Sequence, residues 1–90
     1  MNYRYVAHDN FWKHFHALPD RQKESVRRAW HAFKVDPFSA PLGTHKIFSL
    51  SARYKRTVYS VVIENDLRVI FFMDGNLVVT MDVGTHDTYQ

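Results

Sequence analysis

Two histidines, an arginine and a tyrosine in the second half of the chain have the side chains needed for acid–base chemistry on a phosphate. They are His45, Arg68, His86 and Tyr89. Cleaving a phosphodiester next to a ribose hydroxyl without a metal needs a base for the hydroxyl proton, an acid for the leaving oxygen and a cation for the developing charge. Histidine titrates near neutral pH and arginine stays charged, so these residue types suit the three tasks.

A short basic stretch lies between His45 and Arg68. Its members are Lys46, Arg53, Tyr54, Lys55 and Arg56. Lysine and arginine bind a phosphate backbone, and a tyrosine ring gives a base a face on which to stack. The pattern therefore predicts a nucleic-acid-binding segment, although a charge cluster of this kind is most often a solvated turn.

Each of the four candidate side chains also has a purely structural interpretation. Arg68 can pair with a carboxylate such as Glu64 at the end of the predicted sheet. His86 can cap the polar end of the chain, and Tyr89 can fray or fill the core. His45 can be a solvated histidine at the sheet edge. The sequence leaves these alternatives open.

Composition limits the class of protein. Ninety residues with a net charge of +3 and no cysteine predict one domain, residues 1–90, without disulfides or thiolate metal sites. His14 and His16 do not share a helix face, so no metal site and no cofactor are expected. Neither a signal peptide nor an apolar run long enough for a membrane span is visible, which predicts a cytoplasmic protein.

The last third of the chain predicts a β-hairpin. Two apolar, β-branched and aromatic runs flank Asp74-Gly75, a favoured two-residue turn that would set Met73 opposite Asn76. Both faces of this hairpin are largely apolar. We therefore expect a cover on each face, one of which could come from another chain.

The first half predicts a strand and a helical hairpin. Residues 3–7 are aromatic and β-branched, and Asp9 or Asn10 can cap a helix over residues 11–18. A second amphipathic helix, capped by Asp20, runs to about Val35, because the next residue precedes a proline.

The remaining chain predicts a loop and further strands. Residues 36–44 have no periodicity, residues 45–50 open the sheet, residues 51–56 form a basic turn, and residues 57–63 form a strand. The expected fold class is α+β in the order β-α-α-β-β-β-β. An N-terminal strand and a helical hairpin precede a four-stranded antiparallel meander, which forms a twisted sheet with the helices on one face.

Several of these motifs, in this order, resemble the RelE/ParE superfamily of bacterial toxins over nearly the whole chain. They are Asp36-Pro37 after the helical hairpin, His45-Lys46-Ile47 at the start of the sheet, Leu67-Arg68-Val69-Ile70-Phe71, and the terminal Val83-Gly84-Thr85-His86-Asp87-Thr88-Tyr89. The resemblance implies the toxin of a type II toxin–antitoxin pair. RelE-type toxins enter the ribosomal A site and cut mRNA, ParE-type toxins poison DNA gyrase, and an inactive module that binds its antitoxin or DNA is the third possibility.

The resemblance also implies roles and partners. Arg68 would stabilise the phosphate, His86 and Tyr89 would supply acid–base and positioning or stacking groups, and His45 would be a second acid–base group. The basic stretch would hold the RNA backbone, with Tyr54 as a stacking face. The expected partners are an antitoxin encoded by an adjacent gene, the ribosome and mRNA, with no membrane and no small-molecule cofactor.

Overall fold

In the computed structural model, residues 2–89 are described, and for His86 and Asp87 the backbone alone. The strands are β1 (Arg4–Ala7), β2 (His45–Lys46), β3 (Val58–Glu64), β4 (Leu67–Asp74) and β5 (Leu77–Gly84). The helices are α1 (Asp9–Ala17), α2 (Asp20–Phe33) and α3 (Phe48–Tyr54), with short 3-10 turns η1 (Ala40–Leu42) and η2 (His86–Tyr89). The strands form one sheet in the order β1-β5-β4-β3-β2, in which β1 is parallel to β5 and all other pairs are antiparallel. The α+β fold class and the four-stranded meander are confirmed.

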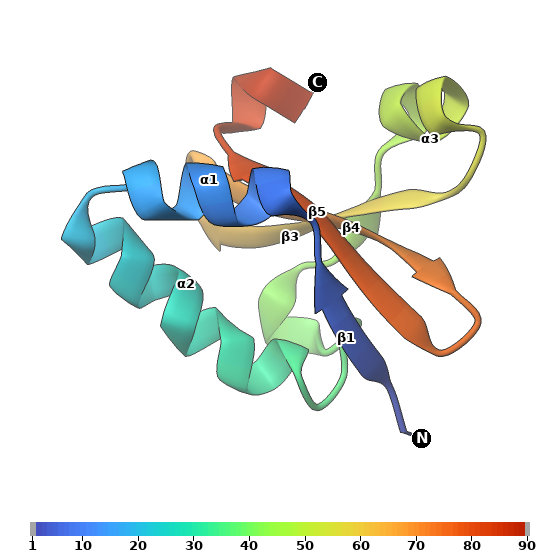
Figure 1. The fold of residues 1–90 in the computed structure, drawn as a ribbon, viewed down its shortest axis with the longest axis horizontal. Helices are drawn as coiled ribbons and strands as arrows, with labels where there is room; N and C mark the ends of the chain where they lie inside the picture. The colour runs from blue at the N-terminus through green and yellow to red at the C-terminus, as the bar shows by residue number, and fades with distance from the viewer. Residues whose placement is uncertain (1, 90) are drawn as a thin grey trace.

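The helical hairpin covers one face of the sheet and builds the larger core (Figure 1). Phe11, Phe15 and Phe33 from the helices pack with Phe71 and Val78 from the central strands. The i, i+3, i+4 spacing of apolar residues in both helices produces this arrangement, because it gathers them on one stripe. We call this the helical face.

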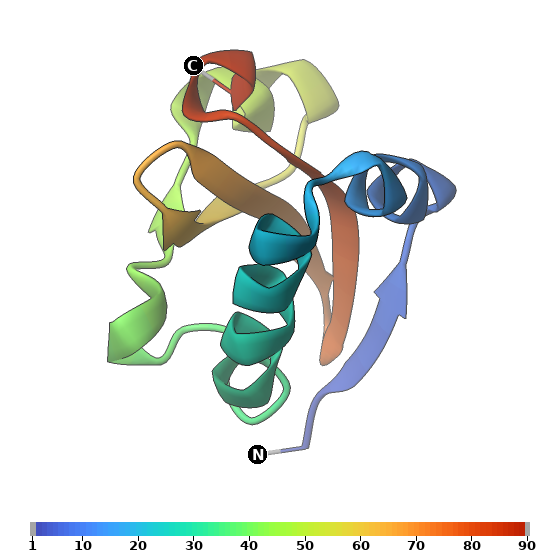
Figure 2. The ribbon, with the colours of Figure 1, turned by 90° about the vertical axis from the view of Figure 1, so that its left-hand side faces the viewer.

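The opposite face carries a smaller core of its own, made by α3 and η2. Ile47, Leu50 and Tyr89 pack there on Val58 and Ile70. Figure 2 shows η2 beside α3, on the other side of the sheet from α2. The two predicted helices lie together on one face, as expected, whereas α3, which the sequence interpretation missed, lies on the other, so much of the second cover comes from this same chain. We call this the α3 face.

The sequence did not predict helix α3, because the stretch that forms it is short and its pattern of apolar residues is ambiguous. The sequence interpretation gave residues 45–50 to the sheet and residues 51–56 to a basic turn, whereas β2 holds just two residues and α3 follows. Ile47 and Leu50 have helical spacing, but seven residues give too few repeats to tell a helix from a strand. The helix ends at Lys55, whose φ of 56° is a conformation usually left to glycine. The sequence therefore contains no glycine that would have predicted the end of this helix.

The terminal hairpin forms as predicted but turns one residue later. Asp74 pairs with Leu77, so Gly75 and Asn76 make the turn, and Met73 faces Val78 instead of Asn76. Gly75 has φ 61°, and Lys55 is the one non-glycine residue with positive φ in the described chain. These angles fit a turn that needs glycine at its first position, rather than the predicted turn with two positive φ angles.

The N-terminal half follows the prediction closely. The helix α1 begins two residues before the predicted start, and its cap is the ring of His8, whose Nδ1 accepts from the Asn10 N–H at 3.1 Å. The predicted cap of α2 is wrong: the helix runs from Asp20 to Phe33, its N-cap is Pro19 without a side-chain hydrogen bond, and it ends two residues before the predicted Val35. Among the described helices, none combines the length and apolar content needed to cross a bilayer.

Candidate active site

Three of the four candidate side chains lie around one small pocket on the α3 face. The pocket has a volume of about 210 Å³ and is lined by His45, Lys46, Ile47, Phe48, Ser60, Arg68 and Tyr89. These residues come from β2, the start of α3, β3, β4 and η2. The fold thus brings together a histidine, two cations and a phenol from positions as far apart in the sequence as His45 and Tyr89.

Arg68 lines this pocket from β4, in a part of the sheet where the pairing with both neighbouring strands is irregular. The β3–β4 register shifts between Val62 and Glu64, and the β4–β5 register shifts between Ile70 and Phe71. Such bulges redirect side chains and are common beside functional sites. Gly84 pairs with Arg68 on the neighbouring strand, and its missing side chain leaves room for the ring of Tyr89.

The guanidinium of Arg68 is held by backbone carbonyls. One terminal nitrogen donates to the Glu64 carbonyl and, at 3.2 Å, to the Leu67 carbonyl. The Glu64 carboxylate instead accepts from the Ser25 hydroxyl at 2.5 Å and lies 3.8 Å from Arg21. The Nε of Arg68 is buried without a hydrogen-bond partner among the described residues. The predicted Arg68–Glu64 ion pair is therefore replaced by a backbone contact, and an arginine donor remains unsatisfied.

His45 is exposed at the sheet edge, but its ring is fixed. Its Nδ1 lies 3.0 Å from the Gly43 carbonyl, which can accept but not donate. Nδ1 must then carry the hydrogen, which leaves Nε2 of the neutral ring as a proton acceptor. This arrangement suits an acid–base group.

Tyr89 fills the smaller core instead of fraying. Its ring is 8% exposed and lies against Gly84, where an added Cβ would come within 2.9 Å of Oη. Burial, and after it the negative charge of Asp82, raises the pKa of the Tyr89 hydroxyl well above its usual range. Oη is buried, and no described residue forms a hydrogen bond of regular geometry with it, although the Asp82 carboxylate lies close enough to raise its pKa. In this position the ring closes one side of the pocket and offers no stacking face to a base.

The tail that delivers Tyr89 is a short turn stabilised by two threonines. The hydroxyls of Thr85 and Thr88 lie 2.8 Å apart, and the Thr88 N–H donates to the Thr85 carbonyl at 3.1 Å. The backbone of His86 belongs to this turn. The side chain of His86 lies outside the described residues, so its proposed role stays a prediction.

The basic stretch surrounds α3 and is exposed along its length. Its residues are Lys46, Arg53, Tyr54, Lys55 and Arg56. The Lys46 ammonium lies 5.0 Å from the centre of the Phe48 ring, and the Arg56 guanidinium lies 4.1 Å from the centre of the Phe72 ring. Phe72 shares the sheet face of Arg68, so Arg56 is fixed on the α3 face.

Three residues of the site were not singled out from the sequence. Phe48 looked like one position of a strand, and Ser60 like one polar residue within an apolar run. Gly84 looked like part of a polar tail, yet it is the residue on which Tyr89 rests. A glycine followed within a few residues by an aromatic is too common to predict such a contact.

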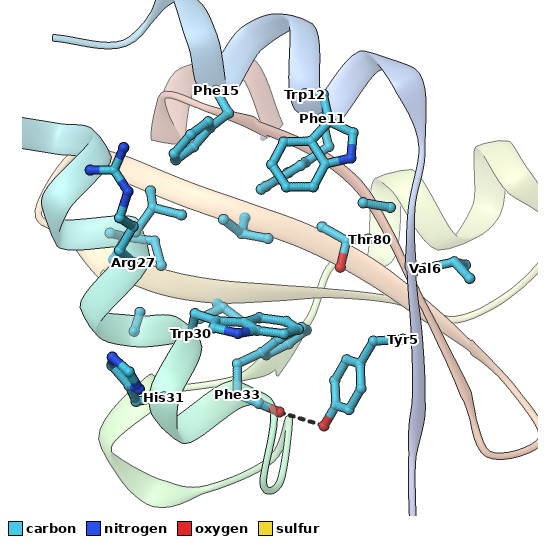
Figure 3. A pocket seen from close by; sticks show the side chains of 16 residues that line it. Tyr5, Val6, Phe11, Trp12, Phe15, Arg27, Trp30, His31, Phe33 and Thr80 are labelled. Atoms are coloured by element: carbon cyan, nitrogen blue, oxygen red, sulfur yellow. Dashed lines mark hydrogen bonds between the residues drawn. The ribbon is translucent and has the colours of Figure 1, made fainter. Parts of the chain in front are cut away.

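The helical face carries a different hollow, an apolar groove of about 560 Å³ between α1, α2 and β1. Figure 3 looks into it, with Trp12 and Trp30 on the two helices and Val6 on β1. Trp12 is 48% and Trp30 is 42% exposed, although the groove around them is apolar. Arg27 and His31 of α2 are among the polar side chains that line it.

No protein-family model and no curated protein matches this sequence. Solved structures do match it. The chain is similar to the archaeal RelE–RelB complex from Pyrococcus horikoshii OT3, with 15% identity, a TM-score of 0.71, and 94% of this chain and 96% of that chain covered. It is also similar to YafQ from E. coli, with 14% identity, a TM-score of 0.74 and 97% of each chain covered.

A third match is a copper-bound mutant toxin from Helicobacter pylori, with 15% identity, a TM-score of 0.65, and 98% of this chain and 99% of that chain covered. All three alignments span almost the entire length of both chains. The chain therefore has the RelE-like fold.

Proposed function

We propose that this chain is the toxin of a type II toxin–antitoxin pair and that it cuts mRNA on the ribosome. The observation that carries this proposal is the pocket where His45, Lys46 and Arg68 meet beside an exposed basic stretch. The RelE-like fold shared with the RelE–RelB complex and YafQ supports it. No described feature favours gyrase inhibition over this activity.

Arg68 would stabilise the charge that develops on the scissile phosphate. Its terminal nitrogen is fixed by two backbone carbonyls, and its unsatisfied Nε needs an acceptor. A donor held in place before the reaction stabilises the transition state without reorganising. A phosphate bound in the pocket would lie beside this guanidinium.

The two histidines would share the proton transfers. His45 has its Nδ1 hydrogen directed to the Gly43 carbonyl, so its Nε2 is free to take the proton of the ribose 2′-hydroxyl. His86 on the tail remains the candidate for protonating the leaving oxygen. Tyr89 would act as a positioning residue, because its buried ring supports the pocket wall next to Arg68.

The basic stretch would hold the RNA backbone around the cut. Its four cations, Lys46, Arg53, Lys55 and Arg56, are all exposed and flank α3. Phosphate neutralisation by a few cations gives weak binding that depends on salt. A pocket of about 210 Å³ holds only a small part of a message. The ribosome would therefore have to present the mRNA to this pocket.

The antitoxin would occupy the apolar groove on the helical face. The groove exposes Trp12, Trp30 and Val6, which is costly in water and typical of a protein-binding surface. An amphipathic helix is a common occupant of such grooves. The groove and the pocket lie on opposite faces of the sheet, so the antitoxin segment bound there would act on toxicity at a distance from the pocket.

Induced expression with and without the neighbouring gene, followed by primer extension on a translated message, tests the proposal. We expect growth arrest and cuts within translated regions, both suppressed by co-expression of the neighbour. Arg68→Ala should remove the cuts. Arrest with intact message would contradict the nuclease and point to gyrase, and no arrest would contradict a toxin.

The role of the groove has its own test. Trp30→Asp places a charge among apolar side chains and should prevent neutralisation by the neighbouring gene product while the cuts remain. A matched change on the exposed surface, Val35→Asp, should leave neutralisation intact. Equal neutralisation of both variants would place the antitoxin elsewhere.

A further inference from the structure

Phe48 is the most exposed large apolar side chain described, at 76% of its surface. It is the first residue of α3, whose buried side is supplied by Ile47 and Leu50. The fold therefore does not need a ring at this position. The ring lines the same pocket as His45 and Arg68, so it is placed where it can contact a ligand bound there.

The backbone that carries Phe48 is fixed by hydrogen bonds on both sides. Next to it, the Ile47 N–H donates to the Val58 carbonyl at 2.9 Å. The Ser51 hydroxyl donates to the Ile47 carbonyl at 2.7 Å and accepts from the Val58 N–H at 2.9 Å. The start of α3 is thus tied to β3 at two points, so a ligand that contacts the ring would not have to order the backbone.

The surroundings of the ring are cationic. Lys46 lies over it at 5.0 Å, and the ring lines the same pocket as Arg68. Arg53 and Lys55 are exposed on the same short helix and its cap. An exposed ring between cations that can bind phosphates is the arrangement with which proteins bind single-stranded nucleic acids, because a base stacks while its backbone is neutralised.

We propose that Phe48 is a base-stacking site for single-stranded RNA, which holds the nucleotide next to the scissile phosphate. This inference rests on the proposed function and deepens it. Because every base has a π-face, the ring would supply affinity and position with little base specificity. Phe48 takes the stacking role that was expected of Tyr54 from its place in the basic stretch and of Tyr89 from the family resemblance.

Tyr54 and Tyr89 fit that role less well. Tyr89 is 8% exposed and occupies the smaller core. Tyr54 ends α3 and is 48% exposed, and it does not line the pocket, whereas Phe48 does. Phe48 thus combines the greatest exposure with direct contact to the pocket.

The test measures binding of a short single-stranded RNA that carries one 2-aminopurine and 2′-O-methyl riboses, so that it cannot be cut. Stacking quenches 2-aminopurine fluorescence. Phe48→Leu keeps apolar volume and removes the π-face, and should abolish the quenching and weaken binding by about 5- to 100-fold, the usual worth of one stacked base. Phe48→Trp should retain both signals.

Two controls separate this effect from others. Val35→Ala changes a residue 69% exposed that touches neither hollow, and it should bind like the wild type. Antitoxin affinity of Phe48→Leu, measured in parallel, should be unchanged. If Phe48→Leu instead weakens the antitoxin complex and not the RNA, the ring belongs to the protein interface and the proposal is overturned.

The remaining outcomes distinguish this inference from the proposed function. If Phe48→Leu quenches the probe as strongly as the wild type, the stacking site is overturned. The proposed function would still stand if the same preparation cuts message on programmed ribosomes. A wild-type chain that neither quenches the probe nor cuts message overturns both.

Discussion

The two faces of the sheet differ in how they use apolar residues. The helical face packs large rings around Phe71, which is completely buried and touches Phe33, Phe38 and Tyr59 with ring centres 5.2 to 5.7 Å apart. The α3 face has a smaller core beside a pocket with buried polar atoms that lack hydrogen-bond partners. This contrast indicates that one face supplies most of the stability and the other holds the chemistry.

The largest expected effect is on the helical face. Phe71→Ala removes the central ring of the larger core and should lower the free energy of unfolding by about 3–5 kcal/mol, as large buried aromatic deletions do. Urea denaturation followed by fluorescence measures it. Val35→Ala, on the surface, should change the midpoint little, and an equally small effect of Phe71→Ala would contradict the division between the faces.

On the α3 face, Arg68→Ala should reduce activity far more than stability. Loss of one fixed donor to developing charge lowers the rate constant by about 10²- to 10³-fold. Single-turnover cleavage on programmed ribosomes measures the change. Arg21→Ala, on the exposed surface of α2, is the matched control and should cleave like the wild type. A stability loss in Arg68→Ala as large as that of Phe71→Ala would make Arg68 a structural residue.

Gly84→Ala tests the stability of the α3 face alone, because it crowds the pocket wall without touching the larger core. The new Cβ would meet Tyr89 Oη at 2.9 Å and its ring carbon at 3.2 Å. Overpacking of this kind costs about 1–3 kcal/mol. Unfolding measurements on Gly84→Ala, Tyr89→Phe and the double variant should show partial recovery in the double variant, since Tyr89→Phe removes the nearest atom. Full additivity would contradict the contact.

Removing the hydroxyl of either of two tyrosines should give the smallest effects, and the two should differ. Tyr5 donates to the Phe33 carbonyl at 2.6 Å, so Tyr5→Phe should cost about 0.5–1.5 kcal/mol, whereas Tyr89→Phe removes an unsatisfied hydroxyl and should cost nothing. The raised pKa of Tyr89 also predicts a pH dependence. The neutral phenol is favoured in the folded state, so its contribution is complete below pH ~10 and decreases above it, by up to about 1.4 kcal/mol per pH unit.

Unfolding of the wild type and of Tyr89→Phe between neutral pH and pH ~11 measures this dependence. The wild type should lose more stability than Tyr89→Phe as the pH rises. Identical curves would show that Tyr89 is accessible to solvent in the folded protein.

The sequence predicted the parts of the molecule whose signals are local or periodic. The helical hairpin follows from apolar spacing, and the terminal β-hairpin follows from its glycine turn. The same patterns did not predict the register, because the turn lies at Gly75-Asn76 instead of Asp74-Gly75, and the bulge between Ile70 and Phe71, which depends on how the strands pack, shifts the pairing again. Nor could they predict α3, whose seven residues have helical spacing in too few positions.

The site was predictable in composition but not in arrangement. His45, Lys46, Arg68 and Tyr89 were all singled out, and all line one pocket. Their roles depend on burial, which no pattern gives. Tyr89 is a buried wall residue, and Phe48 is exposed because α3 turns it outward, whereas a strand at that position would have suggested a core or edge residue.

Cleavage by the purified chain on ribosomes programmed with a defined mRNA tests whether the α3 face is the active face. We expect the wild type to cut message in the ribosome and to leave the same free message intact, and we expect Arg68→Ala, folded as well as the wild type, not to cut. Equal cleavage of free message, or cleavage by Arg68→Ala at the wild-type rate, would contradict the assignment of the α3 face as the active face.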